Sequence, residues 1–188
     1  MNIEFIETGN FFSRSGYKPE IVVIHIMLGT MEGTISWFKN PKSYASAHYL
    51  VAKDGRVVQM VKDENGAWHA GNIDRPSENA KRILKKNGLG IWINPNKYSL
   101  GIECEGKAGD RWTEPQMSSL AELVKTLCVR FGIPQDRLHI MDHQDITSYK
   151  PQLDDWVAEV ISRLRQPEAG SEDREEIKKK IIDLVNQL

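Results

Sequence analysis

The strongest constraint on the fold is a run of six residues, Ile21 to Ile26, in which every residue except His25 is apolar and β-branched. An unbroken run of this kind is typical of a strand buried on both faces, although a turn of buried helix can show the same pattern. The imidazole of His25 would then need a polar partner inside or beside the core. We therefore expect a covered sheet with one polar side chain set into its interior strand.

Four further segments have strand patterns. Residues 47–53 and 56–61 predict a hairpin, because the Asp-Gly pair between them supplies the positive φ angles of a tight primed turn. Residues 99–105 predict another short strand, and residues 137–141 are strand-like. Since these strands alternate with helical patterns, the sequence predicts an α/β fold built in layers.

Helical patterns fall between the strands. The clearest covers residues 114–131, where apolar residues follow one stripe. Thr113 and Gln116 have the spacing of a capping box at its start. Shorter helices are predicted over residues 77–86 and 153–165.

The chain has 188 residues, which suits one domain of ordinary size with a short appendage. We predict a domain over residues 1–166 and, over residues 167–188, a polar linker followed by an amphipathic helix. Its apolar residues have the spacing of a coiled-coil seam, so that helix could pack on the body, pair with a partner chain such as a second copy, or begin a wall-binding module. These residues are Ile177, Ile181, Leu184 and Leu188.

The composition argues against several classes of protein. Lys and Arg total 25 against 26 Asp and Glu, so the net charge of −1 provides no overall basic face for nucleic acid. No apolar run approaches the ~20 residues of a membrane span, and the acidic first residues do not form a signal peptide, so we expect synthesis in the cytoplasm. The spacing of Cys104 and Cys128 predicts two buried free thiols.

Two histidines on separate elements are candidates for metal binding. His25 interrupts the apolar strand, and His143 opens a polar segment that continues to Lys150. Together they could supply two ligands of a catalytic zinc ion, which takes three protein ligands and leaves a fourth position for water. The third ligand would come from an Asp, Glu, Cys or His.

Six motifs then occur in the order and approximate spacing of one family. They are Ile21 to His25, Ser46 to Leu50, Asp54 to Gln59, Ala67 to Gly71, Ser99 to Glu103 and His143 to Lys150. Over about residues 18–160 the chain resembles the zinc-dependent N-acetylmuramoyl-L-alanine amidases. This type is shared by bacteriophage endolysins, bacterial wall-recycling amidases and peptidoglycan recognition proteins.

The resemblance implies a mixed central β-sheet flanked by helices, with zinc in a groove on one face. It also implies hydrolysis of the amide between the lactyl group of N-acetylmuramic acid and L-alanine. His25 and His143 match the two histidine ligands, Glu103 matches the proposed general base, and Lys150 matches the residue that stabilises the oxyanion.

The resemblance also suggests residues for substrate binding. His69 matches a residue that lines the substrate groove, and Trp68 belongs to the same motif. His48 follows Ala47, where endolysin members have a tyrosine, so it could lie on the groove floor or be a packed strand histidine.

The third zinc ligand departs from the family pattern. Two positions after Lys150 the family usually has Asp or Cys, and this chain has Gln152, whose neutral amide is a poor zinc ligand. We expect Asp154 to take the third position, with Asp155 as the alternate. If neither reaches the metal, the chain could bind peptidoglycan without cutting it.

The leading hypothesis is therefore a zinc amidase that cuts bacterial peptidoglycan for cell lysis, as an endolysin does. Such an enzyme is made in the cytoplasm, which is the host cytoplasm for a phage protein, and acts on the wall after release. The alternatives are a non-catalytic peptidoglycan-binding module and an amidase that acts on soluble muropeptides during wall recycling.

Overall fold

The computed structural model describes residues 1–166 and Ile182. The linker and amphipathic helix predicted over residues 167–188, and with them the pairing of that helix with a second copy, lie outside the described residues apart from Ile182. Within the described part of the chain, no helix is long and apolar enough to cross a membrane.

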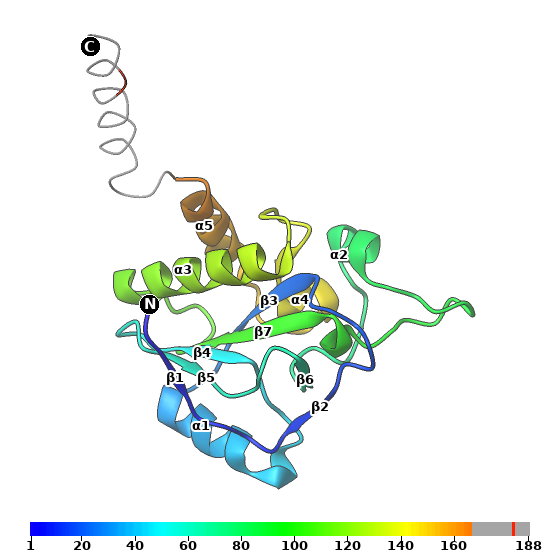
Figure 1. The fold of residues 1–188 in the computed structure, drawn as a ribbon, viewed down its shortest axis with the longest axis horizontal. Helices are drawn as coiled ribbons and strands as arrows, with labels where there is room; N and C mark the ends of the chain where they lie inside the picture. Colours follow the sequence, from blue (N-terminus) through cyan, green and yellow to red (C-terminus); the bar gives the residue numbers. More distant parts are fainter. Residues whose placement is uncertain (167–181, 183–188) are drawn as a thin grey trace.

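A six-stranded mixed sheet forms the centre of the domain (Figure 1). The pairing of β4 with β5 is antiparallel, and the other four pairings are parallel. In spatial order its strands are β1 (Ile3–Phe5), β5 (Val57–Gln59), β4 (Tyr49–Val51), β7 (Ser99–Cys104), β3 (Ile21–Ile26) and β8 (Ile140–Asp142). A separate antiparallel pair is formed by β2 (Phe11–Ser13) and β6 (Asn65–Ala67).

Helices cover both faces of this sheet (Figure 1). The long helix α3 (Glu114–Phe131) and α5 (Asp154–Leu164) pack together on one face, in a core that includes Ile24 of β3 and Ile102 of β7. On the other face, α1 (Met31–Lys39) packs against β4 and β5. The short elements are α2 (Glu78–Ile83), α4 (His143–Ile146) and two 3₁₀ turns, Pro41–Ser43 and Pro95–Lys97. The predicted fold class, a mixed sheet flanked by helices, is confirmed.

The hairpin between β4 and β5 differs from the tight primed turn that the sequence predicted. Ala52 N–H donates to the carbonyl of Arg56, which leaves three residues in the loop. Gly55 has φ +90°, whereas Asp54 keeps a negative φ. This is the three-residue loop in which a turn is followed by glycine in the left-handed region, so the Asp-Gly pair supplies one positive φ angle and not two.

The start of α3 shows only half of the predicted capping box. Thr113 Oγ1 accepts the N–H of Gln116 at 3.2 Å, as expected of an N-cap. The buried side chain of Gln116 instead donates to the carbonyls of Val51 and Glu105 at 3.2 and 2.9 Å. It therefore links α3 to the ends of β4 and β7. The two cysteines are buried and free, as predicted.

The register of three parallel strands determines where the polar residues meet. His25 of β3 pairs with Glu103 of β7, and Ile24 pairs with Asp142 of β8. His143, the next residue along, therefore lies beside His25. His25, Glu103 and His143 therefore lie at the carboxyl ends of parallel strands, which is where ligands bind in open α/β sheets.

Asp142 fixes the chain on both sides of His143. Its Oδ1 accepts the N–H of Asp145, which caps α4, and its Oδ2 accepts the N–H of Leu153 at 2.8 Å. The first bond orients the helix that begins at His143, and the second holds the end of the loop that contains Lys150. The carboxyl is 1% exposed.

We expect Asp142→Ala to lower the free energy of unfolding by about 2–4 kcal/mol, because it removes a helix cap and leaves the buried N–H of Leu153 without an acceptor. Urea denaturation would measure the change. Asp142→Asn, which keeps one oxygen acceptor, should cost less. A loss below about 0.5 kcal/mol for the alanine variant would contradict this role.

Candidate active site

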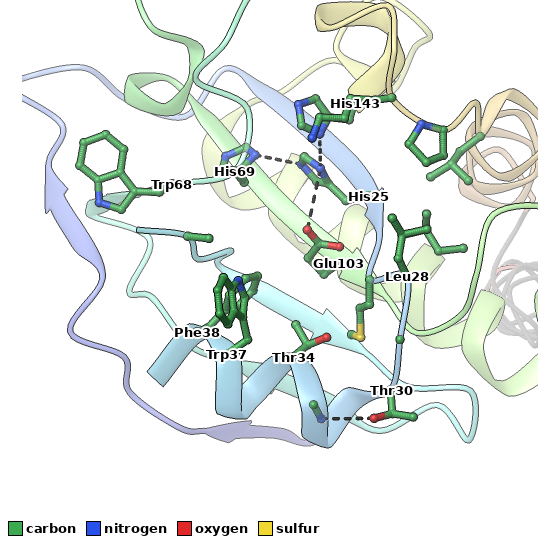
Figure 2. A pocket seen from close by; sticks show the side chains of 18 residues that line it. His25, Leu28, Thr30, Thr34, Trp37, Phe38, Trp68, His69, Glu103 and His143 are labelled. Atoms are coloured by element: carbon green, nitrogen blue, oxygen red, sulfur yellow. Dashed lines mark hydrogen bonds and ion pairs between the residues drawn. The ribbon is translucent and has the colours of Figure 1, made fainter. Parts of the chain in front are cut away.

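A cavity of about 400 Å³ lies where β3 and β7 end, between α1 and the loop that follows α4 (Figure 2). Its polar lining consists mainly of five of the predicted residues and a threonine pair from the start of α1. Aromatic and aliphatic side chains form the rest of the walls. The polar residues are His25, His69, Glu103, His143, Lys150, Thr30 and Thr34.

His25 and His143 meet through the same atom of each ring. Their Nδ1 atoms are 2.9 Å apart, and the rings are tilted by 71°. Burial lowers the pKa of His143 to about 3 and lowers the pKa of His25 well below its usual value. Both imidazoles are therefore neutral near pH 7, which is the form that can bind a metal ion.

Glu103 is the carboxylate of this cluster. Its Oε1 is 4.0 Å from Nδ1 of His25, and within residues 1–166 its buried Oε2 has no hydrogen-bond partner. Burial raises the pKa of Glu103 to about 7, and the charge of Lys150 opposes part of that rise. A carboxyl whose pKa is close to neutrality can both take and return a proton in one reaction cycle.

Lys150 lines the same cavity as His25 and Glu103. Its backbone N–H donates to the carbonyl of Thr147, in the turn after α4, and its Nζ lies 5.7 Å from the centre of the Tyr149 ring. The predicted oxyanion-stabilising residue is thus brought into the same cavity as the histidine pair.

Trp68 and His69 follow β6 and lie on the cavity wall, as Figure 2 shows. The Trp68 indole is 41% exposed and stacks on Phe12, with ring centroids 4.2 Å apart. Nδ1 of His69 is 3.0 Å from Nε2 of His25. Trp68 therefore faces the space that a substrate would occupy, whereas His69 contacts the histidine cluster itself.

His48 does not lie on the groove floor. It is fully buried behind His69, with ring centroids 5.7 Å apart. Its Nδ1 accepts the N–H of Gly101 at 3.0 Å, and its Nε2 is 3.0 Å from the carbonyl of Asn65. Burial lowers its pKa to about 3. The structure therefore gives His48 the other role that the sequence left open, that of a packed histidine.

The structure does not bring Asp154 to the histidine pair. Asp154 Oδ1 accepts from Arg137 at 2.7 Å, and its Oδ2 accepts from the Gln152 amide. Gln152, Asp154 and Asp155 line a second cavity with Trp112. Within the described residues, no three His, Cys, Asp or Glu side chains are arranged to hold a metal ion.

Two groups of residues in and behind the site were not found from the sequence. Trp37 and Leu28 line the cavity and are 54% and 58% exposed. Arg14 is buried behind it, where its guanidinium donates to the carbonyls of Asp63, Lys97 and Ser99. Trp37 lies off the apolar stripe of α1 that Met31, Ile35 and Phe38 form, which was a signal for the first group, but an isolated arginine gave none for the second.

Comparison with known proteins gives a family for this arrangement. The model of the N-acetylmuramoyl-L-alanine amidase family matches residues 15–155. N-acetylmuramoyl-L-alanine amidase A of Achromobacter lyticus is 34% identical over 125 residues, which are 65% of this chain and 58% of that protein. The 1,6-anhydro-N-acetylmuramyl-L-alanine amidase AmpD of Haemophilus influenzae is 32% identical over 117 residues, which are 59% of this chain and 54% of that protein. The match thus spans somewhat more than half of either relative.

Solved structures agree on the fold. A selenomethionine derivative of AmpD superposes with a TM-score of 0.64 at 21% identity, and the match covers 87% of this chain and 94% of the other. PlyL superposes with a TM-score of 0.62 at 19% identity, covering 90% of this chain and all of the other. With the family match over residues 15–155, the chain belongs to the N-acetylmuramoyl-L-alanine amidase family.

Proposed function

We propose that this chain is a zinc-dependent hydrolase that cuts the amide between the lactyl group of N-acetylmuramic acid and the L-alanine of the stem peptide. One observation carries the proposal. Two neutral imidazoles present their Nδ1 atoms to each other, 2.9 Å apart, beside a buried carboxylate 4.0 Å away. This combination of metal donors and a base suits metal-assisted hydrolysis of an amide.

The donor set fits zinc at two positions. A tetrahedral ion with Zn–N bonds of ordinary length separates two ligand nitrogens by roughly 3.3 Å, so a small opening of the His25–His143 pair would admit it. Imidazole nitrogen is among the donors that zinc prefers. We propose that His25 and His143 hold the ion from the protein side.

When bound, a zinc ion supplies a Lewis acid that polarises the scissile carbonyl and makes a water molecule acidic enough to attack near neutral pH. Glu103 takes the proton of that water on a carboxylate oxygen, since its Oε2 is buried at the cavity without another partner among the described residues. It then passes the proton to the amide nitrogen as the L-alanyl amine leaves. This second step is what a carboxyl with a pKa of about 7 can perform.

Lys150 favours the transition state over the substrate. Its charge lies on the cavity wall, where it stabilises the negative charge that develops on the carbonyl oxygen more than it stabilises the neutral carbonyl. Trp68 and Trp37 leave two exposed indoles on the same cavity, which can pack against the sugar and peptide parts of a substrate.

We further propose that the substrate is the wall polymer and that the role is cell lysis, which the enzyme would perform after release from the cytoplasm. The support is the exposure of Trp37 and Trp68, at 54% and 41%, because indoles at a rim can contact a chain that extends beyond the cavity. Action on soluble muropeptides is the other outcome of the activity test below.

The first prediction from this proposal concerns the metal. We expect the purified protein to bind about one zinc ion and His143→Ala to lose it, because the variant leaves only one of the two imidazole ligands. Asp154→Ala should keep zinc, since Asp154 is bonded to Arg137. Elemental analysis after gel filtration checks this. Equal loss from both variants would show that Asp154 is a ligand.

The second prediction concerns the base. Glu103→Gln should lower the rate of amino-group release from isolated cell walls by roughly 10²–10⁴ with zinc content unchanged, because it removes the proton acceptor. Glu64→Gln, on an exposed loop, serves as the charge-matched control. Full activity in the Glu103 variant would refute the mechanism. Release from soluble muropeptides but not from walls would refute the lytic role.

The third prediction concerns stability in the metal-free protein. The pKa of Glu103 is raised in the fold, to about 7 from 4.5, so folding favours its protonated form. Its contribution is fully present below pH 4.5 and is lost as the pH rises through 7. This loss amounts to about 3 kcal/mol.

Glu103→Gln removes this ionisation, so the stability of the variant relative to the wild type should increase between pH 4.5 and 8. Urea denaturation with a chelator present, at several pH values, measures the difference. A difference that does not change with pH would contradict the buried, unpaired carboxyl.

A further inference from the structure

Both ring nitrogens of His69 are occupied by protein groups. Nδ1 is 3.0 Å from Nε2 of His25, and Nε2 is 3.0 Å from Oγ of Ser99 (Figure 2 shows the first contact). The ring meets that of His25 edge-on, at 87°. His69 therefore lines the cavity with both ring nitrogens hydrogen-bonded to other side chains of the protein, so hydrogen bonding to a substrate is not its principal role.

The positions of the protons on His25, His69 and Ser99 depend on one another. A neutral imidazole carries one N–H, so His25 can offer a lone pair at Nδ1 only when its Nε2 is protonated. That Nε2–H then donates to Nδ1 of His69. His69 in turn carries its own proton on Nε2 and donates it to Ser99 Oγ, whose hydroxyl can accept.

The same two hydrogen bonds could also run in the opposite direction. If the Ser99 hydroxyl donated to His69, then His69 would donate from Nδ1 to His25, and the His25 proton would be on Nδ1. In that state the Nδ1 lone pair that faces His143 would be lost. Whether His69 accepts or donates therefore decides whether His25 can bind a metal ion through Nδ1.

The fold holds the His69 ring in this place. A Cβ at position 101 would lie 2.5 Å from Cγ of His69, so the ring occupies the space that Gly101 leaves over β7. The backbone at residue 69 is also fixed, because Asn96 Oδ1 accepts the N–H of His69 at 3.3 Å and that of Ala70 at 2.7 Å. Ser99 is fully buried beneath it.

From this geometry we infer that His69 is a positioning residue: it accepts the Nε2–H of His25 and thereby presents the Nδ1 lone pair of His25 to the metal. This inference rests on the proposed function, in which His25 and His143 hold zinc. Partners that orient metal-binding histidines in this way commonly change metal affinity by 10–100-fold when removed.

Zinc affinity, measured by competition with a chelator, tests the inference without relying on activity. We expect His69→Leu, which fills the space over Gly101 but accepts no hydrogen bond, to weaken zinc binding by about 10–100-fold. His69→Asn, whose amide oxygen can accept where Nδ1 does, should recover most of that loss. Trp68→Leu changes the neighbouring side chain on the same wall and should leave zinc affinity unchanged.

The nitrogen shifts of the imidazoles in the zinc-loaded wild type provide a second readout, which decides the question even if His69→Leu does not fold. We expect a protonated Nε2 and an unprotonated Nδ1 on His69. A protonated Nδ1 on His69, or equal zinc affinity in the wild type and His69→Leu, would overturn the inference alone. A wild type that binds no zinc would overturn the proposed metal site and this inference with it.

Discussion

The parallel pairing of β3 with β7 on one side and β8 on the other is the constraint on which the site depends. It pairs His25 with Glu103 and Ile24 with Asp142. His143, the residue directly after β8, therefore lies beside His25. A slip of one residue would turn His25 toward the core that α3 and α5 cover, where it would meet no polar partner. The register that buries the apolar face is thus the register that assembles the cluster.

Several smaller features hold the cluster in place once the strands are paired. Asp142 caps α4 and fixes Leu153, which orients His143 and the loop of Lys150 together. Gly101 leaves room over β7 for the His69 ring. Burial keeps the imidazoles neutral and raises the pKa of Glu103 to about 7. The same apolar surroundings that stabilise the fold therefore favour the protonation states that the proposed metal binding and proton transfer need.

Much of this could be predicted from the sequence, because local signals and the interior register agree. The strand over residues 21–26 and the helix over residues 114–131 occur with the predicted bounds. The cavity unites His25, Glu103, His143 and Lys150, which the motifs had singled out. The partner of an exposed side chain at the start of a helix depends on which residues the fold brings beside it, so the ion pair of Asp154 with Arg137 was not foreseen. The prediction of a tight primed turn was wrong for a similar reason, since the length of the loop is set by strand register and not by the Asp-Gly pair alone.

The proposed mechanism depends on one metal ion bound between Nδ1 of His25 and Nδ1 of His143. Anomalous diffraction at the zinc absorption edge, from crystals grown with equimolar zinc, tests it most directly. We predict a single strong peak within about 2.0–2.1 Å of both nitrogens, with Glu103 nearby. A peak at Asp154 and Gln152 in the second cavity, or no peak at the histidine pair, would contradict it.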